Sequence, residues 1–129
     1  MIFEKYNANP KNKKTGDCVL RAISTALGQD YWKTLDEMVE VTKKTGYYMS
    51  EKEGYTAYLK SKGYSMQKMP RKWDNTRYTV EEFADELVKP GYNYLIKVAH
   101  HLTCLKDKTL YDTWNCGHKS VGNYWIIYK

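Results

Sequence analysis

The chain changes its residue pattern about two thirds of the way along, and this change restricts the folds open to it. Before residue 90, most apolar residues recur at helical spacing, and glycines end the segments that carry them. After residue 91, short runs rich in β-branched and aromatic residues dominate. Helices followed by a group of strands predict an α+β domain, with N-terminal helices packed on a C-terminal antiparallel β-sheet.

The helices have recognisable start signals. Four are predicted, over residues 17–27, 31–44, 50–62 and 80–87. Asp17 is expected to cap the first helix with its carboxylate. Ser50 with Glu53, and Thr79 with Glu82, have the spacing of a capping box, in which each side chain bonds to a backbone amide of the other residue.

The strands follow from composition and turn signals. They are predicted over residues 64–69, 92–99, 102–106, 109–114 and 121–128. Residues 1–15 are polar, contain Asn9-Pro10, and are expected to form a loop. A chain of 129 residues without a linker is expected to fold as a single domain over 1–129.

A turn at residues 107–108 fixes the pairing of the two strands beside it. A two-residue turn there places Thr103 opposite Asp112. Because side chains alternate between the two faces of a strand, His101, Thr103 and Asp112 share one face, and His100 is expected on the other. Asp112 is then a diagonal neighbour of His101.

Cys18 follows Thr15-Gly16-Asp17 at the start of the first predicted helix. A lone cysteine is often a small buried apolar residue, but helix amides at this position stabilise a thiolate. Cys18, His101 and Asp112 together supply a nucleophile, a proton carrier and a group that orients the imidazole. Asn115 is the alternative third member, because an amide oxygen also orients an imidazole. Trp114 fits either a shield over the site or core packing.

Acyl transfer also needs donors for the developing oxyanion. The backbone N–H of Cys18 is one such donor. Asn12, six residues earlier, is the candidate side-chain donor, and Asn9 is a second candidate. Both asparagines also fit as ordinary loop residues.

Metal and nucleic-acid sites are weakly indicated. Zinc-type ligands occur at His100, His101, Cys104, Cys116 and His118, but their spacing matches no familiar zinc motif, so no metal and no cofactor are expected. The net charge of +6 arises from 21 Lys and Arg against 15 Asp and Glu. This charge permits weak, non-specific contact with nucleic acid, and no motif for specific recognition accompanies it.

The first residues and the number of cysteines indicate the cellular compartment. The first residues have no apolar signal core, and no stretch is long enough to span a membrane. Three cysteines is an odd number. These features favour a cytoplasmic protein without a disulfide framework and without membrane contact.

Two short blocks resemble a known family. Thr15–Ile23, and His101–Thr103 with Tyr111–Trp114, are similar to the papain-like cysteine peptidase superfamily. The resemblance is greatest to small phage and bacterial members akin to bacteriocin-leader processing peptidase domains. It implies a nucleophile at Cys18, a general base and acid at His101, and an orienting group at Asp112. It also implies a protein or peptide substrate, no cofactor, and a bacterial or phage-infected cytoplasm.

The chain departs from that family in two ways. Asn12 stands where relatives have a glutamine, and the segment from His101 to Asp112 is shorter than in larger members. The superfamily includes peptidases, acyltransferases and inactive members, so fold likeness leaves several functions open. The expected function is a thiol hydrolase, a peptidase or isopeptidase. The alternatives are an acyltransferase or transamidase with the same triad, and a non-catalytic phage or bacterial binding or inhibitor protein.

Overall fold

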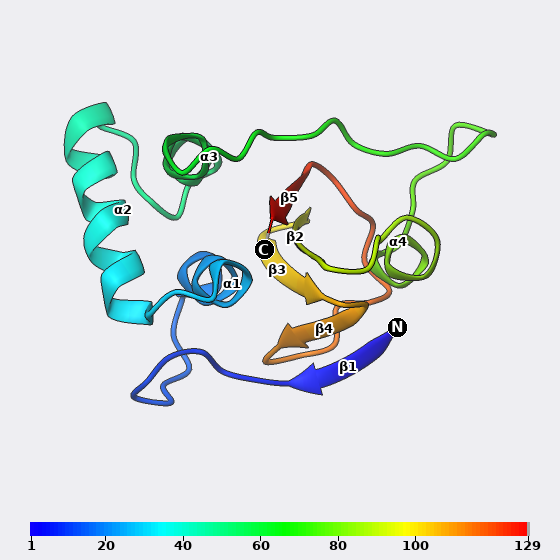
Figure 1. Ribbon diagram of the computed structural model, residues 1–129, viewed down its shortest axis with the longest axis horizontal. Helices are drawn as coiled ribbons and strands as arrows, with labels where there is room; N and C mark the ends of the chain where they lie inside the picture. Colours follow the sequence, from blue (N-terminus) through cyan, green and yellow to red (C-terminus); the bar gives the residue numbers. More distant parts are fainter. Residues whose placement is uncertain (129) are drawn as a thin grey trace.

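A computed structural model describes residues 1–128 and shows an α+β fold with four helices and a five-stranded mixed sheet in that part of the chain (Figure 1). In chain order the elements are β1 (Ile2–Lys5), α1 (Cys18–Leu27), α2 (Tyr31–Thr45), α3 (Lys52–Ser61), α4 (Val80–Glu86), β2 (Tyr92–Val98), β3 (His101–Lys106), β4 (Thr109–Asp112) and β5 (Tyr124–Tyr128). The predicted order of helices before the main strands is confirmed.

The sheet has the strand order β1-β4-β3-β2-β5. Strands β2 to β5 pair antiparallel, but β1 lies parallel to β4 at the edge. The expected loop over residues 1–15 is therefore wrong at its start, and the sheet is mixed rather than wholly antiparallel. Strand β1 is short and mostly exposed. Hydrogen bonds to the free edge of β4 stabilise β1. No local pattern in the sequence predicts such an edge contact.

Two apolar cores lie on opposite faces of the sheet. Helix α1 packs on one face, with α2 on its outer side. Helix α3 lies beside α1 and reaches β5, and α4 covers part of the other face (Figure 1). Alternation along β3 divides its side chains between the cores: Leu102 packs towards α1, and Leu105 packs with Phe83 of α4. This arrangement places the first turn of α1 beside the start of β3.

The two predicted capping boxes have different outcomes. At α4 the box is confirmed, because Thr79 Oγ1 accepts from Glu82 N at 3.1 Å and Glu82 Oε1 accepts from Thr79 N at 2.9 Å. The box at Ser50 is wrong: α3 begins at Lys52, and Glu51 occupies the cap position without a side-chain cap bond.

A close contact between Tyr48 and Gly54 determines how the chain enters α3. The carbonyl of Tyr48 lies against Gly54, where an added Cβ would sit 2.1 Å from the oxygen. Glu51 N also bonds to Tyr48 O at 3.0 Å. This turn carries the chain past Ser50 before the helix begins. The strand predicted over residues 64–69 is also wrong, since only Gln67 forms a bridge, to Tyr124 of β5.

The turn at residues 107–108 is confirmed. Both residues have positive φ, 49° and 66°, as a type I′ hairpin turn requires. Leu105 lies opposite Leu110, in the predicted register. A second tight turn precedes β3, where Val98 pairs with His101. His100 lies in that turn with φ 57°, so it is an exposed turn residue and not a strand residue on the opposite face.

Candidate active site

Cys18 is the first residue of α1 and is partly buried. The preceding Asp17 makes no side-chain cap bond, so the predicted cap is wrong. Its carboxylate instead accepts from Tyr31 Oη at 2.7 Å and Asn9 Nδ2 at 3.1 Å, and it pairs with Arg21. Asp17 therefore connects the preceding loop to α1 and α2. Its carboxylate does not accept a hydrogen bond from the first-turn amides of α1.

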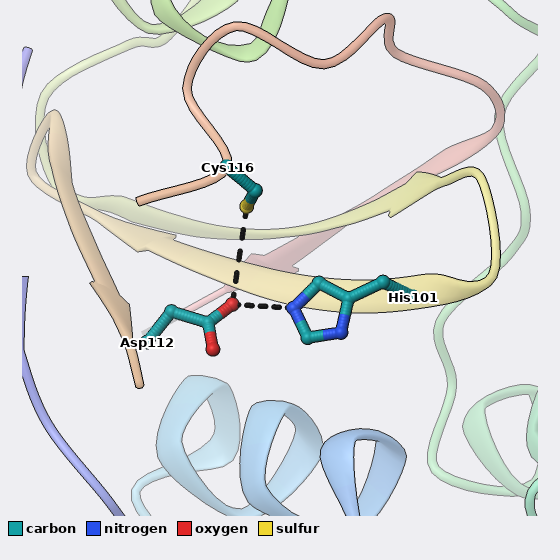
Figure 2. A group of neighbouring side chains, drawn as sticks. All are labelled: His101, Asp112 and Cys116. Atoms are coloured by element: carbon teal, nitrogen blue, oxygen red, sulfur yellow. Dashed lines mark hydrogen bonds and ion pairs between the residues drawn. The ribbon is translucent and has the colours of Figure 1, made fainter. Parts of the chain in front are cut away.

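The structure brings the three predicted site residues together. His101 Nε2 lies 2.6 Å from Asp112 Oδ2, so the predicted diagonal contact between the two strands is confirmed. Figure 2 shows the second ring nitrogen of His101 pointing away from Asp112. His101 also lies close enough to the Cys18 thiol to lower the pKa of the thiol, and the thiol in turn raises the pKa of His101. The thiol, the imidazole and the carboxylate thus form one continuous chain from α1 to β3 and β4.

Asp112 is held by more partners than the sequence indicated. Oδ2 also accepts from Thr103 Oγ1 at 2.6 Å, and Oδ1 accepts from Thr113 N at 2.7 Å. The thiol of buried Cys116 lies 3.9 Å from Oδ2 (Figure 2). Thr103 was already on the predicted face. Cys116 follows β4 in a loop, where no sequence pattern indicated its proximity.

The contacts shift both pKa values towards an ion pair. Burial alone would raise the pKa of Cys18. The hydrogen bond and charge of His101, the backbone N–H of Leu102 and the charge of Arg21 outweigh burial, and the pKa falls below its usual value. Burial also disfavours the charged form of His101, but its hydrogen bonds to Asp112, Cys116 and Cys18 raise its pKa well above the usual value. Both shifts favour the thiolate form of Cys18 and the imidazolium form of His101.

This ion pair predicts a distinct alkylation profile. Reaction of Cys18 with iodoacetamide should extend below the free-thiol pKa of about 8.5, because the thiolate persists as pH falls. The profile is measured by intact mass and peptide mapping across pH in native protein. Cys104 is an internal control, since burial raises its pKa to about 12 and shields it. His101→Ala should move the Cys18 midpoint upward, and an unchanged midpoint would contradict the pairing.

The alternative third member lies away from the imidazole. Asn115 is exposed, and its Oδ1 accepts from Gly117 N at 2.9 Å within the loop after β4. Strand β4 ends at Asp112, so the strand predicted over residues 109–114 is too long and Trp114 lies beyond its end. Its ring nevertheless lies 5.1 Å from the His101 ring, tilted by 48°, and it is 39% exposed. This position fits a cover over the imidazole rather than core packing.

The side-chain donor for an oxyanion remains a prediction. Asn12 is exposed with φ 53°, and it borders neither of the two cavities that Cys18 lines. Asn9 is buried, but its amide already donates to Asp17 and its oxygen accepts from Lys11 N at 2.8 Å. The candidate oxyanion donors that remain are the backbone amides at the start of α1.

One group has the composition of a metal site. Ligand atoms of His101, Asp112 and Cys116 lie within 4.8 Å of one another. Two ligands on a tetrahedral zinc ion at its usual bond lengths lie roughly 3.3 Å apart. The 2.6 Å between His101 Nε2 and Asp112 Oδ2 is shorter and fits a hydrogen bond. In this arrangement the pair orients the imidazole rather than binding an ion.

Cys18 borders two spaces. An open cavity of about 250 Å³ on one side is also lined by Lys52, Tyr55, Lys97, His100 and His101. A smaller, more enclosed space of about 10 Å³, close to the size of one water molecule, separates Cys18 from Arg21 and Asp112. The larger cavity gives a substrate access to the thiol.

No helix within residues 1–128 is long and apolar enough to cross a membrane. Comparison of the chain with protein-family models, with curated proteins and with solved structures finds no match. The functional assignment therefore rests on the chemistry of the thiol, the imidazole and the carboxylate at the mouth of the cavity.

Proposed function

We propose that the protein is a thiol hydrolase that cleaves peptide or isopeptide bonds through a Cys18 thioester. The observation that carries this proposal is the chain of contacts from the Cys18 thiol through His101 to Asp112. The thiol stands at a helix start, where amide dipoles favour the thiolate, and it borders an open cavity. Structural cysteines more commonly lie buried without such a partner.

We further propose that the fold is papain-like. In its support, the helix that begins with Cys18 packs against a sheet whose strands β3 and β4 carry His101 and Asp112. The parallel edge strand β1 is an addition to the layout expected from the sequence. The order of cysteine, histidine and acid along the chain also fits this family.

In the proposed reaction, the Cys18 thiolate attacks the carbonyl carbon of the scissile amide and forms a C–S bond. The carbonyl electron pair moves to oxygen, and in this proposal the N–H of Cys18 donates to that oxyanion. The His101 imidazolium gives its proton to the leaving nitrogen as the C–N bond breaks. Neutral His101 then takes a proton from water, which attacks the thioester and releases the acid and the thiolate.

Asp112 acts through His101 in this scheme. Its hydrogen bond to Nε2 leaves the other ring nitrogen free to exchange a proton with Cys18 and the substrate. The negative charge also stabilises the imidazolium. Thr103 and Thr113 hold the carboxylate in place, so the ring has one preferred orientation.

The proposal predicts a trapped acyl-enzyme. Native protein mixed with p-nitrophenyl acetate should release a rapid burst of nitrophenolate and gain one acetyl group, mapped to Cys18 by mass spectrometry. His101→Ala should lose the burst. The matched control His118→Gln should retain it, because His118 is exposed and lies outside the chain from Cys18 to Asp112. Acetylation confined to lysines would refute covalent catalysis by Cys18.

A further inference from the structure

The open cavity beside Cys18 has cations on two of its walls and no carboxylate among its lining residues. Lys52 lies in the first turn of α3, and Lys97 lies on β2. Lys52 Nζ donates to Asn123 Oδ1 at 2.6 Å, and Lys97 Nζ donates to the Val98 carbonyl at 2.7 Å. Within residues 1–128 neither ammonium group forms an ion pair, so no carboxylate is paired with either cation.

The two lysines are close enough to affect each other. Burial lowers the pKa of Lys97, and the charge of Lys52 lowers it further, whereas a negative charge on Cys18 raises it. The positive charge of His101 lies beside Cys18 and lowers the pKa of the thiol, so it offsets any negative charge that forms there. The cavity therefore has excess positive charge at the place where a substrate meets the thiol, and a bound anion would relieve the repulsion.

One residue that lines the cavity has a buried hydroxyl without a partner. Tyr55 is only 2% exposed, and its Oη has no hydrogen-bond partner within residues 1–128. Tyr55 lines the same cavity, on the helix that also carries Lys52. Its ring packs edge-on against Trp125, with centroids 5.7 Å apart, which restricts its movement. Buried hydroxyls normally have partners, so Tyr55 has an unused donor next to the cavity.

We propose that this cavity binds a carboxylate of the substrate between Lys52 and Lys97. The volume of about 250 Å³ suits one side chain or chain end rather than a whole ligand of drug size. The peptidase then prefers a peptide whose bond to be cleaved lies beside an acidic side chain or a terminal carboxylate. The choice of a peptide rests on the proposed function, but the affinity for a carboxylate does not.

The test uses two small thiol reagents that differ in charge. Iodoacetate carries a carboxylate, and iodoacetamide is its neutral counterpart. The measured quantity is the ratio of their alkylation rates at Cys18. Both reagents need the thiolate, so a change in the thiol pKa cancels in this ratio. A protein without hydrolase activity would still show the preference, which separates this test from the acetylation test of the proposed function.

Wild-type protein should have an iodoacetate-to-iodoacetamide ratio about threefold above that of Lys52→Gln or Lys97→Gln, and about tenfold above that of the double variant. Lys60→Gln is the matched control. It removes an equal charge from α3 at an exposed position outside the cavity, and it should leave the ratio unchanged. Raising the salt concentration to about 0.5 M should lower the wild-type ratio.

The wild-type salt series keeps the test decisive if a cavity variant fails to fold. A wild-type ratio that ignores salt, or one equal to that of a folded double variant, would overturn the carboxylate site. If Lys60→Gln lowers the ratio as much as the cavity variants do, the site is also overturned, because the preference then reflects only the net charge of the protein.

Protection against iodoacetamide then identifies the source of the carboxylate. Three alanine-based pentapeptides are compared: one with a central glutamate and blocked ends, one with a central glutamine and blocked ends, and one of alanine alone with a free carboxyl end. Protection of Cys18 by the glutamate peptide supports an acidic side chain. Protection by the free-ended peptide supports a chain terminus. Equal protection by all three peptides contradicts carboxylate recognition.

Discussion

Replacing Cys18 with alanine is expected to reduce turnover to the uncatalysed background while changing the free energy of unfolding by no more than about 1 kcal/mol. The thiol is the only protein group in the proposed reaction that bonds to the substrate carbon. Cys18 is partly exposed at a helix start, so its removal creates little cavity. Ester turnover and urea unfolding are measured on the same preparations.

Cys104→Ala is the matched control for the loss of a thiol. Cys104 is fully buried in the core beneath α1. Its replacement should lower the free energy of unfolding by about 1–2 kcal/mol and leave turnover per folded molecule nearly unchanged. If Cys18→Ala retains burst activity, or if the two variants exchange these outcomes, then Cys18 is a structural cysteine and the hydrolase proposal fails.

Replacing Asp112 with alanine is expected to damage both activity and stability. Turnover should fall about 10²- to 10⁴-fold, less completely than in Cys18→Ala, because a poorly oriented imidazole still transfers protons. The free energy of unfolding should fall by about 3–5 kcal/mol, because the charged His101 ring and the Thr103 hydroxyl lose their buried partner. Kinetics and urea unfolding on one series of variants check both effects.

Asn115→Ala is the control for the third member of the triad. Asn115 bonds to Gly117 N and not to His101, so its loss should leave turnover nearly unchanged. Asp112→Asn should retain much of the packing while losing the charge, which separates the electrostatic from the steric effect. Equal activities of Asp112→Ala and Asn115→Ala would contradict the role assigned to Asp112.

The pH dependence of stability gives a second measure of Asp112. Burial would raise its pKa, but hydrogen bonds from His101 and Thr103 lower it below the unfolded value of about 3.9. Its contribution to stability is therefore complete above that value and is lost as pH falls through the lower, folded-state pKa. Unfolding of Asp112→Ala should depend less on pH in this acid range than unfolding of the wild type.

The sequence alone determined the elements that rest on short-range signals. The periodicity ending at Gly28 predicted α1, and the Thr79 box predicted α4, because the groups that satisfy these helix ends lie within a few residues. The turn at residues 107–108 fixed the register of β3 and β4. From that register alone followed the meeting of His101 and Asp112, since strand alternation converts register into facing side chains.

Only the tertiary structure decided the features that depend on distant partners. Strand β1 pairs with the edge of β4, and Cys116 lies beside Asp112. Asp17 accepts a hydrogen bond from Tyr31 instead of capping its own helix. Each of these contacts joins segments that share no local sequence pattern. The cationic cavity likewise joins α1, α3 and β2, brought together by apolar burial around the sheet. The hydrophobic effect is non-directional. The sequence therefore shows which residues are buried together, but not which of them become neighbours.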